Sequence, residues 1–113
     1  MPKIGVTNAE HYSWGHGCDG WHLVNTPGLS IIQERIPPGE GETRHRHRHA
    51  RQFFFVLSGQ ARFELGDTTL ELGPNDGVEV APGTPHRILN PGSTELSFLV
   101  ISQPHSHGDR ESA

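Results

Sequence analysis

Only one cysteine, Cys18, and no long hydrophobic run occur in this sequence. A single thiol excludes a disulfide within the chain and fits a reducing compartment. No run of about 18 apolar residues and no basic-then-apolar N-terminus are visible, so we expect neither a membrane span nor a signal peptide. The expected location is therefore cytoplasmic, with no membrane partner.

An excess of positive charge is also lacking, since the formal net charge is −4 at pH 7. This charge argues against a general nucleic-acid binder. Four arginines nevertheless form a basic stripe that can attract anions, namely Arg44, Arg46, Arg48 and Arg51. We interpret the stripe as a solvated outer face with ion pairs to Glu40 and Glu42, because no aromatic ladder accompanies it for base stacking.

Helical periodicity is the third feature that the sequence lacks. Nine Pro and 14 Gly separate short apolar segments, which predicts short strands joined by tight turns. Strands are predicted at residues 21–24, 29–36, 43–48, 52–58, 61–65, 68–72, 78–81, 86–90 and 94–102. This regular spacing is typical of an all-β jelly roll or closed barrel, which limits the exposed strand edges.

The chain is short enough for one domain. We expect a lead-in segment over residues 1–28, a barrel over residues 29–102 and a polar, mobile tail over residues 103–113. His105 and His107 in this tail are interpreted as disordered or as an adventitious metal-binding pair. Cys18 allows two interpretations, a reactive thiol near the barrel mouth or a small buried apolar residue.

Four side chains form the most informative pattern. His45 and His47 lie one residue apart, so on a strand they point the same way. Gln52 opens the next predicted strand and His86 opens a distant one, and both can converge on the pair. Three neutral imidazoles and one oxygen donor suit a divalent transition metal. The alternative is a solvated, histidine-rich strand; His49 shares its parity but is expected in the following turn.

The histidines belong to a longer joint pattern. It reads Gly39-(x)5-His45-x-His47-(x)4-Gln52-(x)6-Gly59, followed from Gly77 by Pro82-Gly83-Thr84-Pro85-His86-(x)3-Asn90. Over roughly residues 29–102 the chain resembles the cupin superfamily, whose motifs read G(x)5HxH(x)3–4E(x)6G and G(x)5PxG(x)2H(x)3N. Gln52 stands where most cupins have Glu, and Pro82 is displaced by one position from the family's proline.

The resemblance implies a double-stranded β-helix, or jelly-roll barrel, with one metal ion per chain. The expected ligands are His45, His47, Gln52 and His86, and the expected ion is Zn, Ni, Fe or Mn. A glutamine amide is neutral, so it would leave the full +2 charge on the ion and favour a more acidic bound water. The alternative is a centre of three histidines and waters, to which Gln52 does not bind.

The expected function is action on a small organic molecule at the open metal position. Phe54, Val56 and Ile88 would form the apolar wall of the pocket. Dioxygenation requires a redox metal, whereas isomerase or lyase chemistry runs on Zn, Ni or Mn. No motif places a catalytic base, and Glu64 and Glu79 are expected to face outward. A non-catalytic module that binds or senses a small molecule is therefore the alternative.

The strand at residues 52–57 is apolar on both faces. If Gln52 faces the metal, then Phe53, Phe55 and Leu57 face outward and need cover. Cover can come from the N-terminal segment, from packing between the sheets, or from a second subunit. We expect a homodimer, which is also common in the resembled family.

Overall fold

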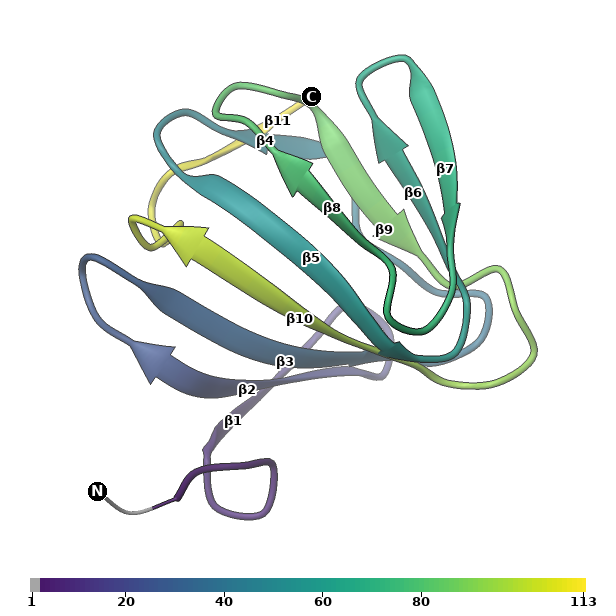
Figure 1. Ribbon diagram of the computed structural model, residues 1–113, viewed down its shortest axis with the longest axis horizontal. Helices are drawn as coiled ribbons and strands as arrows, with labels where there is room; N and C mark the ends of the chain where they lie inside the picture. The colour runs from purple at the N-terminus through teal and green to yellow at the C-terminus, as the bar shows by residue number, and fades with distance from the viewer. Residues whose placement is uncertain (1–2) are drawn as a thin grey trace.

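Two antiparallel sheets face each other in the computed structural model, which describes residues 3–113 (Figure 1). Those residues contain no helix, and the expected jelly roll, or double-stranded β-helix, is confirmed. The strands are β1 (Glu10–Trp14), β2 (Cys18–Asn25), β3 (Ser30–Ile36), β4 (His45–His47), β5 (Arg51–Ser58), β6 (Ala61–Leu65), β7 (Thr68–Leu72), β8 (Gly77–Val80), β9 (His86–Leu89), β10 (Leu96–Gln103) and β11 (Arg110–Ser112). One sheet has the order β1-β2-β3-β10-β5-β8, and the other has the order β11-β4-β9-β6-β7.

Residues 3–113 include no helix with the length and apolar character that crossing a membrane requires.

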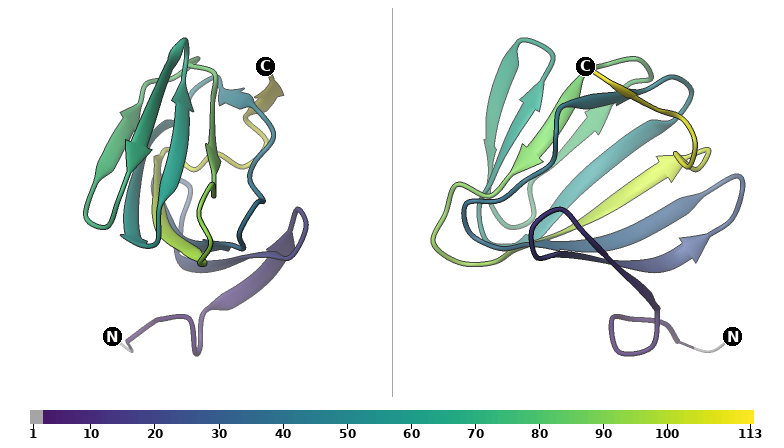
Figure 2. Two further views of the ribbon diagram at one scale, coloured as in Figure 1. Left: turned by 90° about the vertical axis from the view of Figure 1, so that its right-hand side faces the viewer. Right: turned by 180° about the vertical axis from the view of Figure 1, so that it is seen from behind.

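The two ends of the chain depart from the predicted strands. β1 was not predicted from the sequence, and it pairs with the first residues of β2. The prediction of a mobile tail is wrong for Arg110–Ser112, because this segment forms β11 and pairs with β4. Figure 2 shows this strand lying along the edge of its sheet, on the side away from β7. The predicted hairpin is confirmed as β6 and β7, with register partners from Ala61↔Leu72 to Leu65↔Thr68.

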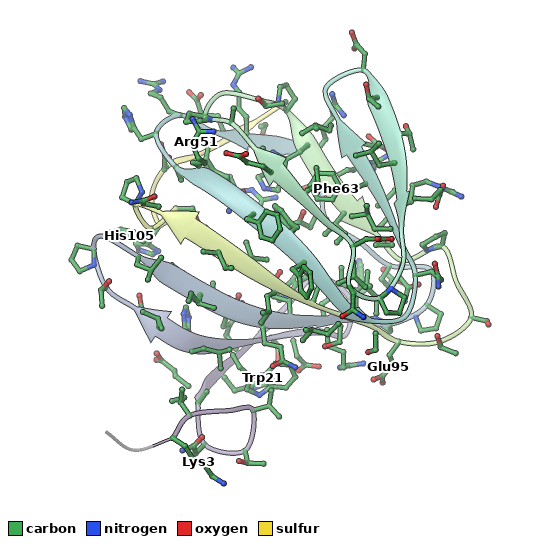
Figure 3. All side chains as sticks on the ribbon, in the orientation of Figure 1. Lys3, Trp21, Arg51, Phe63, Glu95 and His105 are labelled. Carbon is green, nitrogen blue, oxygen red and sulfur yellow. The ribbon has the colours of Figure 1, made fainter. Side chains whose placement is uncertain are left out.

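The core lies between the sheets and is built from the inward positions of alternating strands. Phe54 and Phe63 pack with ring centroids 4.8 Å apart, and Phe98 lies 6.1 Å from Phe54 on its other side. Figure 3 shows Phe63 between the two sheets. Cys18 belongs to the same buried cluster, and burial raises the pKa of its thiol. Cys18 is therefore a core residue rather than a reactive thiol.

Two residues of the joint motif have structural roles. Gly59 has a φ of 86°, and a Cβ added there would lie 2.4 Å from the carbonyl oxygen of Glu95, so only glycine fits this turn. Asn90 is buried, and its Nδ2 donates to the carbonyl oxygens of Ile36 and Thr94 at 2.9 Å each. Its amide therefore ties the end of β9 to β3 and to the loop before β10.

The arginine stripe is paired with carboxylates, as expected, but with different partners. Arg44 binds Glu64 at 3.1 Å and Arg51 binds Glu79 at 2.8 Å, while Glu111 accepts from both Arg46 and Arg48. Figure 3 shows Arg51 at the outer rim of the sheet. The expectation of pairs with Glu40 and Glu42 is wrong, because β11 brings a carboxylate to the stripe and Glu42 turns into the interior.

β5 has the predicted facing. Gln52, Phe54 and Val56 are buried, whereas Phe53 and Leu57 are each 38% exposed. Within residues 3–113 the N-terminal segment leaves this outer face uncovered. Its apolar side chains continue across the pairing with β10, where Leu99 opposes Phe55 and Ile101 opposes Phe53.

Candidate metal centre

Three histidines from two strands converge at the interior of the second sheet. β4 is only three residues long, and its alternation turns both His45 and His47 inward. β9 begins with His86, and its ladder pairing with β4 consists of one residue pair, His45↔His86. The potential ligand atoms of the three rings all lie within 4.8 Å of one another. The sequence-predicted trio is therefore brought together, and all three rings are buried.

Backbone carbonyls fix two of the imidazole tautomers. Nδ1 of His45 donates to the carbonyl oxygen of Thr43, and Nδ1 of His86 donates to that of Thr84, both at 2.8 Å. Each proton on Nδ1 leaves a lone pair on Nε2, which is the arrangement found when an imidazole binds a metal. Nδ1 of His47 is buried without a hydrogen-bond partner among the described residues. The ring of His47 thus also has a nitrogen atom that is available to bind a metal.

The surroundings keep these rings uncharged at neutral pH. Burial lowers the pKa of His45 to about 3 and that of His47 to about 4, and it also lowers the pKa of His86. Arg110 adds to the lowering at all three rings through its positive charge. Neutral imidazoles are the form that binds a cation.

Gln52 completes the cluster from β5. Its Nε2 donates to Oγ of Ser102 at 3.0 Å, which turns its Oε1 toward Nε2 of His86 at 3.1 Å. Because Nδ1 of His86 carries the proton, two lone pairs face each other, and a cation between them relieves the repulsion. In the opposite orientation the amide would donate to His86, which is the arrangement expected without a cation. Three imidazoles, one of which has an unpartnered buried nitrogen, and an amide oxygen therefore fit a divalent transition metal.

A cavity of about 320 Å³ adjoins the cluster. His45, His47, Gln52 and Phe54 line it. Val56 and Ile88 were expected on its wall, but they lie wholly within the core, because the barrel interior is filled by side chains at their depth. Residues that the sequence analysis did not place at the site complete the lining: Tyr12, Trp14, Ile32, Glu34, Glu42, Val100, Ser102, Ser106, His107, Gly108 and Arg110.

Two carboxyl groups in this lining have strongly perturbed acidity. Burial raises the pKa of Glu34 to about 7, although its Oε2 accepts a hydrogen bond from the Tyr12 hydroxyl at 2.8 Å. Burial, aided by the negative charge of Glu34, raises the pKa of Glu42 to about 8. The Oε1 atom of Glu42 accepts from the backbone N–H of Ile88 at 3.1 Å. Two candidate acid–base groups therefore share the cavity with the histidines.

The alternation of inward and outward residues along β3 indicates from the sequence that Glu34 faces the interior. Glu34 shares the parity of Ser30, Ile32 and Ile36, and Ser30 and Ile36 are buried. A carboxylate on the inward face of a strand is a functional candidate because burying it is costly. No comparable signal marks Tyr12 or Arg110, since both belong to terminal strands without apolar periodicity.

The cavity opens beside a second one of about 620 Å³. Tyr12, Ile32, Ser106 and His107 line both. The outer cavity also includes His22, whose Nδ1 is buried without a partner among the described residues. A ligand that reaches the histidines can therefore extend into a larger chamber of mixed polar and apolar lining.

The jelly roll and its interior histidine cluster define a class of small β-barrel proteins with a candidate metal site. Residues 32–102 match the model of the cupin domain family, and the chain belongs to this family. An uncharacterized protein of Methanocaldococcus jannaschii is 30% identical over 83 residues, which cover 73% of this chain and 66% of that protein.

Two solved structures share the fold over most of both chains. KdgF from Halomonas sp. superimposes with a TM-score of 0.82 at 20% identity, covering 90% of this chain and 93% of KdgF. Pac13, described as a nucleoside dehydratase, superimposes with a TM-score of 0.80 at 18% identity, covering 100% of this chain and 91% of Pac13. At these identities the likeness establishes the fold.

Proposed function

We propose that this protein is a metal-dependent enzyme of the isomerase or lyase type, acting by proton transfer on a small organic molecule. The observation that carries the proposal is the pair of carboxyl groups with pKa values near neutrality, Glu34 and Glu42, in the cavity beside the histidines. A general base or acid works best when its pKa lies near the working pH. Dioxygenation makes no such demand, so proton transfer is favoured over it.

The metal would be one divalent ion per chain, Zn, Ni, Fe or Mn, held by His45, His47, His86 and Gln52. When bound, such an ion polarises an oxygen atom of the substrate. The absence of charge on the Gln52 amide favours that role, because a carboxylate at the same place would offset part of the ionic charge.

The two carboxyl groups would take different roles in proton transfer because their pKa values differ. At neutral pH Glu34 is partly ionised, so its Oε1 can accept a proton while Oε2 keeps the hydrogen bond from Tyr12. Glu42, whose pKa is about 8, is mostly protonated and can donate a proton to a departing oxygen. Proton abstraction by one group and proton donation by the other is the chemistry of water elimination or of a double-bond shift. The dehydratase function described for Pac13 supports this reaction class.

The metal site is tested by elemental analysis of protein purified without added metal. We expect about one divalent ion per chain. The background variant His105→Ala/His107→Ala removes the tail pair and should keep the ion. Adding His45→Ala, His47→Ala and His86→Ala should abolish it, whereas one retained ion per chain in that variant would place the metal elsewhere.

The reaction class is tested with the metal-loaded protein in D2O and a panel of 3-hydroxy acids and 3-hydroxy ketones. We expect solvent deuterium to enter the carbon next to the carbonyl group, followed by loss of water, both visible by NMR. Glu34→Gln should lower the rate roughly 100-fold or more. The matched control Glu79→Gln alters a carboxylate on the outer face, paired with Arg51, and should leave the rate unchanged.

Two results would redirect the assignment. Oxygen consumption without deuterium exchange would indicate a dioxygenase. Tight binding of a panel member without exchange or turnover would indicate a binding or sensing module.

A further inference from the structure

One arginine differs from the others in its ionic partners. Seven arginines are within ion-pair distance of a carboxylate: Arg35, Arg44, Arg46, Arg48, Arg51, Arg62 and Arg87. Within residues 3–113, Arg110 has no carboxylate partner, and it is also the arginine that lines the cavity beside the histidines. A side chain that could have paired on the surface, as its neighbours do, instead faces the site.

Hydrogen bonds hold the guanidinium of Arg110 in place but occupy only some of its donors. Its Nη2 donates to Oγ1 of Thr43 at 2.8 Å and to the carbonyl oxygen of Thr43 at 3.4 Å. Within the described residues, its Nε and Nη1 donate to no protein atom. Because the fork of an arginine matches two oxygens of one acid group, the unused donors suit an oxyanion.

The backbone of Arg110 is fixed at the edge of the site. In the pairing of β11 with β4, Arg110 lies opposite His47. The preceding carboxylate, that of Asp109, accepts from the backbone N–H groups of Arg48, His49 and Ala50 at 3.1, 2.8 and 2.9 Å. The loop between β4 and β5 thus anchors the strand that carries the arginine, so the charge has a defined place.

The charge of the cavity calls for an anion. The candidate ligands are three imidazoles and an amide, so none of them offsets the charge of a bound cation. Arg110 adds a further positive charge that lowers the pKa of both Glu34 and Glu42, but burial outweighs it, so these carboxyl groups are only partly ionised near neutral pH and offset only part of the excess. A neutral substrate would leave the rest of this excess uncompensated in a partly buried space, whereas a substrate with an acid group would help to balance it.

We propose that the ligand of the inner cavity is a small organic acid, and that Arg110 binds its carboxylate and thereby selects it. This inference rests on the proposed function for the identity of the site, and it names the substrate class. A carboxylate is favoured over a phosphate ester because the nearby Glu34 and Glu42 oppose a second negative charge. The volume of about 320 Å³ suits a molecule of this size.

The experiment measures binding rather than turnover, so its result is independent of the reaction class. Metal-free protein, in which Arg110 supplies the positive charge of the cavity lining, is titrated with 3-hydroxybutyrate, with its neutral amide and with 3-hydroxypropyl phosphate, and NMR shifts report the dissociation constants. We expect the acid to bind roughly tenfold more tightly than the amide and more tightly than the phosphate. Arg110→Gln should remove the preference for the acid, and Arg110→Lys should retain only part of it.

The matched control is Arg62→Gln, which removes an exposed arginine paired with Glu71 away from the cavity. It should leave the preference for the acid intact. Arg110 lies at an exposed strand edge, and an unchanged thermal unfolding midpoint of Arg110→Gln confirms that the fold persists. Equal affinity for acid and amide, or an unchanged preference in Arg110→Gln, would overturn the assignment. Tighter binding of the phosphate through Arg110 would overturn the choice of carboxylate.

Discussion

At the scale of single residues, the amide of Gln52 sets the charge of the candidate metal centre. It occupies a position where a carboxylate would be nearly isosteric, and Ser102 holds its orientation. The amide offers a dipole to a cation, whereas a carboxylate offers a full charge. A carboxylate in place of the amide would therefore raise the metal affinity and lower the Lewis acidity of the ion.

The substitution Gln52→Glu should tighten metal binding and lower the Lewis acidity of the ion. Competition with a chelator at neutral pH should show a lower dissociation constant, and the pKa of any metal-bound water should rise. In the metal-free protein the buried carboxylate should lower the thermal unfolding midpoint, and a bound ion should offset this loss. An unchanged affinity together with an unchanged titration would mean that Gln52 does not bind the ion.

The two cavity carboxyl groups should make the metal-free protein less stable as pH rises above neutrality. The folded-state pKa values of Glu34 and Glu42, about 7 and 8, lie above the ordinary value of 4.5. Their contribution to stability is therefore complete below about pH 4.5 and is lost as pH rises through 7 and 8. The histidines, whose pKa values are lowered, act in the opposite direction and only below about pH 6.5.

Denaturant unfolding with a chelator present, between about pH 6.5 and pH 8, reports on the carboxyl groups and stays below the range in which the Cys18 thiol titrates. We expect the free energy of unfolding to fall by about 2 kcal/mol across this range. Glu34→Gln/Glu42→Gln should flatten the dependence, because an amide stays neutral, and Glu79→Gln should not. A flat profile for the unmodified protein would contradict the raised pKa values.

At the scale of elements, sequence periodicity anticipated the strands that bury one face. β3 was expected at residues 29–36 and spans Ser30–Ile36, and β6 and β7 have the predicted bounds. β1 and β11 could not be predicted in this way, because both are edge strands of polar composition whose partners, β2 and β4, decide their structure. The same reason explains why the histidines were found from the sequence, while Tyr12 and Arg110 were not.

The carboxylate of Asp109 anchors the start of β11, and Asp109→Asn should loosen this anchor. The amide keeps the shape but offers a neutral acceptor to the three backbone N–H groups, which weakens charge-assisted bonds. We expect hydrogen exchange of the Arg48, His49 and Ala50 amides to accelerate roughly tenfold. The control Asp67→Asn, in the exposed turn between β6 and β7, should leave these amides unaffected.

At the scale of the whole molecule, the outer face of β5 and β10 is the feature that a single chain leaves incomplete. Phe53 and Leu57 are each 38% exposed, and their apolar neighbours on β10 extend the surface. A contiguous apolar face of this kind usually marks a protein contact. The cavity lies on the inner side of the same sheet, so this outer apolar face is separate from the candidate site.

We expect a homodimer that covers Phe53, Phe55 and Leu57. Light scattering should give a mass of about twice 12.5 kDa, and Phe53→Asp/Leu57→Asp should give a folded monomer, since it buries charge in the contact. The control Thr69→Asp, on an exposed position of β7, should remain dimeric. A monomeric unmodified protein at micromolar concentration would contradict the expectation.

The single ladder pair between β4 and β9 has a kinetic consequence. His45 and His86 form this pair, and both are candidate metal ligands. An ion bound by both would therefore cross-link β4 and β9, the strand pairing with the fewest residue pairs in the second sheet. Opening this pairing also breaks the flanking backbone bonds from the N–H of Gly83 to His47 and from the N–H of Glu42 to Ile88, which are still far fewer than unfolding the barrel would break. We therefore expect the ion to enter and leave through brief separations of β4 from β9, which would let the protein exchange its metal while the core stays folded.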